Sequence, residues 1–186
     1  MKLLLCISFY FFAFSDVNVT LKNNTEAEEK ARVQLERILS DYKISQWLFT
    51  KEIMINEKEF IPFSHPTLTI NTRYLDNDLK QMSTFIHEQF HWLQEKRSKD
   101  FEAAINDFKQ MFPEVPEAKD GGARDVYSTY LHLIVCNLEY EAMTSLVGKA
   151  EARKIIEGWK HYSWIYDKVL NDPRIPEITK KHNITI

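Results

Sequence analysis

Residues 83–92 read Ser-Thr-Phe-Ile-His-Glu-Gln-Phe-His-Trp, and they contain the pattern His-Glu-x-x-His. On an α-helix, residues four apart lie about 40° apart around the axis and one turn along it, so His87 and His91 can bind one ion at about 2.0–2.1 Å. Glu88 is turned about 100° from His87. Its carboxylate therefore stays off the metal and within reach of a coordinated water. The motif predicts a zinc site in which Glu88 is the general base.

Apolar residues at helical spacing surround the motif. At about 100° per residue, six of them fall within a stripe about 80° wide, the core face of an amphipathic helix: Leu75, Leu79, Met82, Ile86, Phe90 and Leu93. His87 and His91 lie roughly 100–140° from the middle of that stripe. Two histidines that only packed in the core would lie inside it, so their position favours metal binding. Asp76 and Asn77 are suited to begin this helix.

Composition indicates one domain. The chain has 186 residues, of which 44% are hydrophobic and 13% aromatic, enough for one domain with a core and too little for two. The net charge is -3, and no cluster of Lys and Arg interleaves with aromatic residues, so no nucleic acid partner is expected. We expect a polar linker at 16–24 and a single domain over 25–186.

The first residues have the form of a secretory signal peptide. Met1-Lys2 is followed by an apolar run at 3–14, and Ala13-Phe14-Ser15 suits a cleavage site. The run is too short to span a bilayer comfortably, so no stable membrane span is expected in the mature chain. Residues 1–15 predict an extracytoplasmic or secreted protein; the alternative is a buried segment of a cytoplasmic one. Cleavage would leave Cys136 without a disulfide partner, which argues mildly against export.

Changes of sequence period predict an α+β fold. Residues 25–47 carry helix formers at helical spacing. Residues 49–55 and 60–63 are β-branched and aromatic runs joined by a turn. Residues 66–71 alternate apolar and polar side chains after a proline, which suits an edge strand of a small mixed sheet. Further helices are expected at 100–111, 124–147 and 150–170, separated by Pro and Gly residues.

The predicted edge strand lies immediately before the helix that carries the motif. An exposed edge offers free backbone N–H and C=O groups to an extended peptide. A peptide or protein substrate bound along residues 67–71 would lie beside the metal. The alternative is an ordinary edge that another segment covers.

The histidine pair needs a third ligand, because a hydrolytic zinc site normally has three protein ligands and one position for water. The helix at 124–147 carries His132, Cys136, Glu139 and Glu141. The two carboxylates lie on opposite shoulders of its apolar stripe, and His132 lies close to Glu139 in angle. Periodicity alone does not choose between them. A cysteine in such a position is more often a small buried hydrophobic residue than a ligand.

The motif and the downstream segment Leu138-Glu139-Tyr140-Glu141-Ala142 together resemble the zincin metallopeptidases of the gluzincin type. They are most similar to the small minimal gluzincins and to the prenyl-protein and heat-shock membrane proteases, in which Glu-aromatic-x-Ala-Asp supplies the third ligand. A similar Glu-x-x-Ala signature occurs in the anti-repressor metallopeptidases of mobile elements. The resemblance implies a zincin-like fold, Zn²⁺ held by the two histidines and Glu139, and cleavage of peptide bonds. Met143 stands where those proteases have Asp.

A peptidase also needs a group that stabilises the oxyanion beside the metal or orients a ligand. The candidates are His132, His161, Tyr162 and Tyr166, although aromatic residues are also typical of core packing. The leading interpretation is a zinc-dependent peptidase. The alternative is a non-catalytic zincin-like scaffold that binds partners. The presence of Glu88 argues against the scaffold, because binding alone needs no base.

Overall fold

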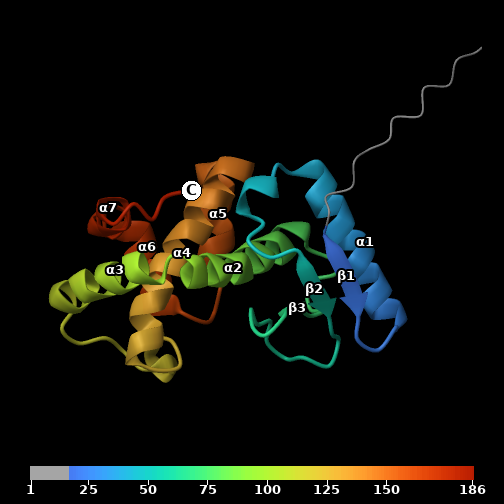
Figure 1. Cartoon of the computed structure of the whole chain (residues 1–186), viewed down its shortest axis with the longest axis horizontal. Helices are drawn as coiled ribbons and strands as arrows, with labels where there is room; N and C mark the ends of the chain where they lie inside the picture. The colour runs from blue at the N-terminus through green and yellow to red at the C-terminus, as the bar shows by residue number, and fades with distance from the viewer. Residues whose placement is uncertain (1–16) are drawn as a thin grey trace, which may run out of the picture.

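The computed structural model describes residues 17–186, and the predicted signal peptide at 1–15 lies outside them. Within this range the chain forms a three-stranded sheet and seven α-helices (Figure 1). The expected α+β class is therefore confirmed. None of the helices in the described range has both the length and the apolar character needed to cross a membrane.

The sheet is parallel throughout, where the sequence predicted a mixed one. Its order is β1 (Asn18–Leu21), β2 (Glu52–Ile55) and β3 (Leu68–Ile70). Helix α1 (Glu26–Asp41) connects β1 to β2, which is the kind of crossover that parallel neighbours require. The predicted linker at 16–24 is wrong, because β1 lies inside it and pairs with β2.

A buried carboxylate ties the ends of β1 and β2 to the start of α1. Glu28 is fully buried, and its carboxylate accepts hydrogen bonds from the backbone and side chain of Asn23 at 2.8 and 2.7 Å and from the Glu57 N–H at 3.1 Å. Thr25 caps the helix by accepting from the Glu28 N–H. The helix ends at Asp41, earlier than predicted, and Ser45–Trp47 forms a separate 3-10 turn.

Helix α2 (Asp78–Lys96) lies between the sheet with α1 and the helical half of the molecule (Figure 1). Asn77 caps it by accepting a hydrogen bond from the Lys80 N–H, as the sequence predicted. Helices α3 (Ser98–Met111) and α4 (Val126–Val147) follow. Helix α4 ends at Gly148, whose φ of 82° lies in the region that favours glycine.

Helix α4 is the centre of the helical half. It packs against α2, α3, α5, α6 and α7, and apolar residues occur nearly all round it, which is typical of a buried helix. Four polar residues are nevertheless buried on it, Thr129, His132, Asn137 and Glu139; of these, His132 is 7% exposed and Glu139 is 1% exposed. Buried polar groups of this kind need hydrogen-bond partners.

The predicted helix at 150–170 is two helices. Helix α5 (Lys149–Glu157) ends at Gly158, and α6 (Ser163–Asn171) begins after Tyr162, which has a left-handed φ of 55°. The chain leaves the helical path at 158–162 and brings this segment to the cleft described below. Helix α7 (Arg174–Lys181) then follows a proline and was not predicted.

Gly121 fixes the start of α6 against the loop before α4. Its carbonyl accepts a hydrogen bond from the Trp164 N–H at 3.2 Å. With a φ of 92°, a Cβ at this position would lie 2.6 Å from the Trp164 nitrogen. Only glycine fits this close approach without strain.

The free side of β3 is covered at its middle residue. The Thr69 N–H and C=O both bond to the backbone of Phe63, at 2.8 and 3.0 Å. The predicted strand at 60–63 is thus reduced to a single bridge. The predicted edge at 67–71 does not offer the Thr69 backbone groups to a ligand.

Glu28→Gln should lower the free energy of unfolding by about 2 kcal/mol at neutral pH, because a neutral amide cannot accept every hydrogen bond that the buried carboxylate accepts. Burial alone would raise the pKa of Glu28, but hydrogen bonds from Asn23, Glu57 and Thr25 outweigh it and hold the pKa below its ordinary 4.5. The stabilisation is therefore present above pH 4.5 and is lost as the pH falls through the folded-state pKa.

Urea unfolding at several pH values measures this difference. Glu29→Gln is the matched control, because Glu29 is exposed and, among the described residues, its carboxylate pairs only with Arg32 on the same helix; it should change stability by at most about 0.5 kcal/mol. Equal losses in the two variants would contradict the structural role of Glu28.

Candidate active site

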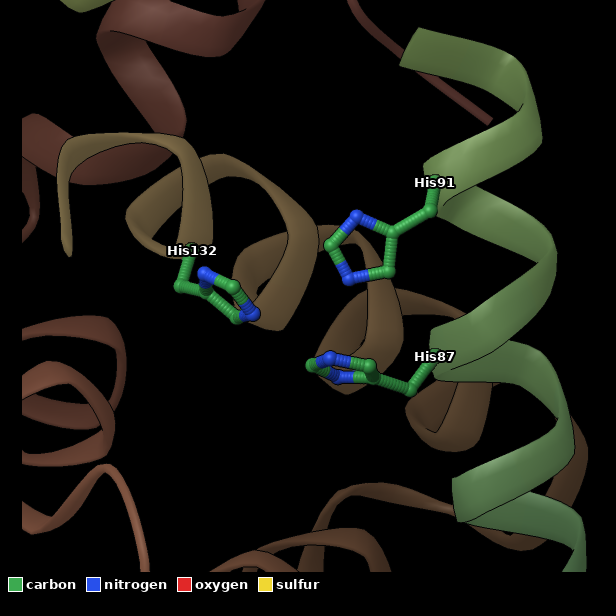
Figure 2. A group of neighbouring side chains, drawn as sticks. All are labelled: His87, His91 and His132. Atoms are coloured by element: carbon green, nitrogen blue, oxygen red, sulfur yellow. The ribbon is translucent and has the colours of Figure 1, made fainter. Parts of the chain in front are cut away.

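Three imidazole side chains meet between α2 and α4. His87 and His91 come from α2 and His132 from α4, and all three point toward one another (Figure 2). Their ligand nitrogens lie within 4.8 Å of one another. A tetrahedral zinc ion with bonds of about 2.0–2.1 Å would bring the nitrogens to about 3.4 Å, so small side-chain rotations suffice to form the site.

Hydrogen bonds fix the orientation of two of these rings. The His132 Nδ1 lies 2.6 Å from the carbonyl oxygen of Ser128. A carbonyl can only accept, so Nδ1 carries the proton and Nε2 has the free lone pair. The His87 Nδ1 lies 2.9 Å from the Glu139 carboxylate. Within residues 17–186 the His132 Nε2 has no hydrogen-bond partner, and the His87 ring also contacts the Cys136 thiol. This arrangement is typical of metal-binding histidines.

The electrostatics of the site leave lone pairs available. Burial lowers the pKa of His132 to about 3, and burial with the neighbouring histidines holds the pKa of His91 well below its ordinary value. Burial alone would lower the pKa of His87 too, but contacts with Cys136 and Glu139 outweigh it and raise that pKa. The Glu139 carboxylate thus favours positive charge on the His87 ring, whether a proton or a metal supplies it.

Glu139, the predicted third ligand, lies behind His87. Its carboxylate accepts hydrogen bonds from the Ser83 hydroxyl, from the His87 Nδ1 at 2.9 Å and from the Tyr166 hydroxyl at 2.8 Å. Its ligand atoms group with those of His87 and Cys136, and that fully buried group contains neither His91 nor His132.

Glu88 is the one carboxylate beside the three imidazoles that forms no hydrogen bond with any described residue. It is 8% exposed and lines the cleft. Burial raises the pKa of Glu88 to about 7, with a lowering contribution from His87 and a raising one from Glu139. A carboxylate of this kind can take up a proton near neutral pH.

The three imidazoles face a cavity of about 580 Å³. Its lining includes residues 60–64, which follow β2, and residues 159–162, which lie between α5 and α6. Phe60 is 75% exposed and Ile61 is 67% exposed. The Arg73 guanidinium lies over the Phe60 ring at 4.4 Å and donates to the Phe60 carbonyl at 2.9 Å. The cavity is therefore apolar at one border and carries charged and hydrogen-bonding groups at its base.

Tyr162 lies beside the imidazoles. Its ring centroid is 4.5 Å from that of His132 and 6.1 Å from that of His87. Burial raises the pKa of Tyr162, so its hydroxyl stays protonated and can donate a hydrogen bond. His161 contacts the rings of Trp159 and Tyr162 at 5.1 and 5.0 Å and belongs to neither group of potential ligands.

The other predicted residues have structural partners. Tyr166 is buried and donates to Glu139, as described above. Glu141, the alternative carboxylate, accepts a hydrogen bond from the Asn137 side chain at 3.1 Å and lies in neither group of ligands. Burial raises the pKa of Cys136, which keeps this thiol protonated.

Two serines of the site were missed in the sequence. Ser83 precedes His87 by four residues and Ser128 precedes His132 by four. Residues four apart share a face of a helix, so this spacing was a usable signal. Residues 60–64 were also missed as part of the site, because their position depends on the bridge to Thr69.

A scan against models of protein families found no match to this chain, and searches of curated proteins and of solved structures found none either. The resemblance to gluzincins therefore stays a prediction from two short motifs. What the site can do follows from its donor atoms: two neutral imidazoles, a third imidazole held by a carboxylate, and a second carboxylate that forms no hydrogen bond with residues 17–186.

Proposed function

We propose that this chain is a zinc-dependent peptidase in which Glu88 is the general base. The observation that carries the proposal is the Glu88 carboxylate, which is 8% exposed, lines the same cavity as the three imidazoles and has no hydrogen-bond partner among residues 17–186. Burying an unpaired carboxylate costs stability. Such groups with raised pKa values are typical of catalytic sites, and here the contribution of His87 does not outweigh the effect of burial.

The side chains fit a zinc ion. Neutral imidazole nitrogens are among the preferred ligands of Zn²⁺, and the low pKa values of His91 and His132 keep their lone pairs free. When bound, zinc polarises a carbonyl group and lowers the pKa of a coordinated water. Helix α2 supplies two ligands and α4 supplies the third.

Glu88 moves the proton during hydrolysis. It accepts a proton from the attacking water while the water oxygen forms a bond to the carbonyl carbon. The Tyr162 hydroxyl donates a hydrogen bond to the oxyanion that develops on the carbonyl oxygen. When the C–N bond breaks, Glu88 passes its proton to the leaving nitrogen. The products are a carboxylic acid, which keeps the second proton of the water, and an amine, and Glu88 returns to its starting state.

The backbone beside the cavity supports a peptide substrate. Phe63 pairs with Thr69, but within the described range the Pro62 carbonyl and the Ser64 N–H have no hydrogen-bond partner. Both residues line the cavity. These two groups are suited to pair with an extended peptide, as an edge strand does. The proposed peptide-binding edge is therefore 62–64 and no longer 67–71.

The alternative function is a scaffold that binds peptides in the same cavity without cleaving them. The exposed side chains of Phe60 and Ile61 suit either function. Glu88 distinguishes the two, because a scaffold would gain stability by replacing this residue with a neutral one and would lose nothing.

Purified protein should contain about one zinc ion per chain, and adding zinc after chelation should raise the thermal unfolding midpoint, since the ion binds only the folded site. Elemental analysis and differential scanning calorimetry measure the two quantities. Protein that retains no metal and is not stabilised by added zinc would rule out the proposed function.

Glu88→Gln should lower kcat for peptide hydrolysis by about 100-fold or more, because the amide cannot accept the proton. Zinc content should be unchanged, and the free energy of unfolding of the metal-free protein should stay equal or rise. Glu95→Gln is the matched control, because Glu95 lies on the same helix and is exposed. Wild-type turnover by the Glu88 variant would exclude Glu88 as the base.

Ser64→Pro should lower kcat/KM for peptides about tenfold, because it removes the backbone N–H that we assign to the substrate, a contact worth about one hydrogen bond. Ser64→Ala keeps this N–H and should change kcat/KM little. Peptidase assays on both variants, with equal zinc content, make the comparison. Equal effects of the two substitutions would exclude pairing along 62–64.

A further inference from the structure

We infer that His132, and not Glu139, is the third metal ligand, and that Glu139 positions His87 through its Nδ1. This inference rests on the metal site of the proposed function. It departs from the gluzincin pattern, in which the glutamate of the downstream motif binds the metal. It assigns different roles to the two buried polar residues of α4 that face α2.

The arrangement of the three rings carries the first step. The ring centroids of His87, His91 and His132 are separated by 5.2, 5.5 and 5.1 Å, so the rings form a nearly equilateral triangle. One ion at its centre can be reached from all three. The His132 ring comes from α4, whereas the other two come from α2. The packing of α4 against α2 therefore holds the three rings in this arrangement.

The contact between Glu139 and His87 carries the second step. The carboxylate lies 2.9 Å from the His87 Nδ1. It can therefore accept a hydrogen bond from Nδ1–H while Nε2 binds the metal. A metal-binding histidine normally donates its other N–H to a carboxylate or carbonyl, which fixes the tautomer and makes the ligand more basic. The His132 ring has the same arrangement, with the Ser128 carbonyl at its Nδ1.

The surroundings of Glu139 carry the third step. Hydrogen bonds from Ser83 and Tyr166 use the same carboxylate, and the residue is 1% exposed. An ion bound there with His87 and Cys136 would lie in a fully buried group. Cys136 does not line the cavity, whereas His87, His91 and His132 all do. An ion held by the three imidazoles would therefore lie where a water and a substrate can reach it, as a hydrolytic site requires.

Cobalt(II) titration of four variants separates the roles of the two residues, because its visible absorption reports the ligand set. His132→Ala should weaken binding as strongly as His91→Ala does, by about 100-fold or more, and alter the absorption bands, since each removes a ligand. Glu139→Gln should weaken binding by about 10–100-fold and leave the band shape unchanged, because the amide oxygen can still accept from Nδ1. Glu141→Gln is the matched carboxylate control on α4 and should bind as the wild type does.

The opposite pattern would overturn the inference. In that case Glu139→Gln would change the cobalt absorption bands, and His132→Ala would leave the bands and the metal affinity unchanged.

Long-range ¹H–¹⁵N spectra of the zinc-loaded wild type test the same point without any substitution. Three histidines should show coordination through Nε2, with Nδ1–H retained in His87 and His132. Coordination by only His87 and His91 would overturn the assignment. A wild type that binds metal in this way and cleaves no peptide would end the proposed function and leave the ligand assignment intact.

Discussion

The hydrogen bond between Glu139 and His87 joins the two helices on which the site depends. A buried carboxylate needs partners, and losing one typically costs about 3–5 kcal/mol, so the contact fixes the register of α2 against α4. Ser83 lies at Glu139 and His91 lies near His132. The two helices therefore run in opposite directions at the site, and the buried carboxylate on α4 holds His87 of α2 in place.

The two glutamates show how environment separates roles in one site. Glu139 has three donors around it, so its burial is compensated and its side chain cannot easily turn toward another group. Glu88 has none among the described residues and its pKa is raised by burial to about 7. The compensated carboxylate suits positioning, and the uncompensated one suits proton transfer, because a group that accepts and releases protons must not be held in one charge state.

Local signals predicted the motif helix well, and long-range pairing limited the rest. The apolar stripe and the Asn77 cap define α2 without reference to the fold. In contrast, β1 is a short run of Asn-Val-Thr-Leu whose strand identity comes from pairing with β2. Periodicity placed His132 and Glu139 on the same side of α4. Which of the two side chains lies beside His91 depends on the register of α4 against α2. That register depends on side-chain packing between segments far apart in the sequence.

The interruption between α5 and α6 explains why the site is a cavity and not a closed core. A continuous helix over 150–170 would carry 159–162 along its own axis, whereas the left-handed Tyr162 turns the segment toward the imidazoles. The strain of a left-handed non-glycine residue costs about 1 kcal/mol or more. The contact of Gly121 with the first turn of α6 holds this geometry. Three parts of the chain thus line the cavity. The helical half supplies His132 and the aromatic residues of 159–162, the segment after β2 supplies residues 60–64, and α2 supplies His87, Glu88 and His91.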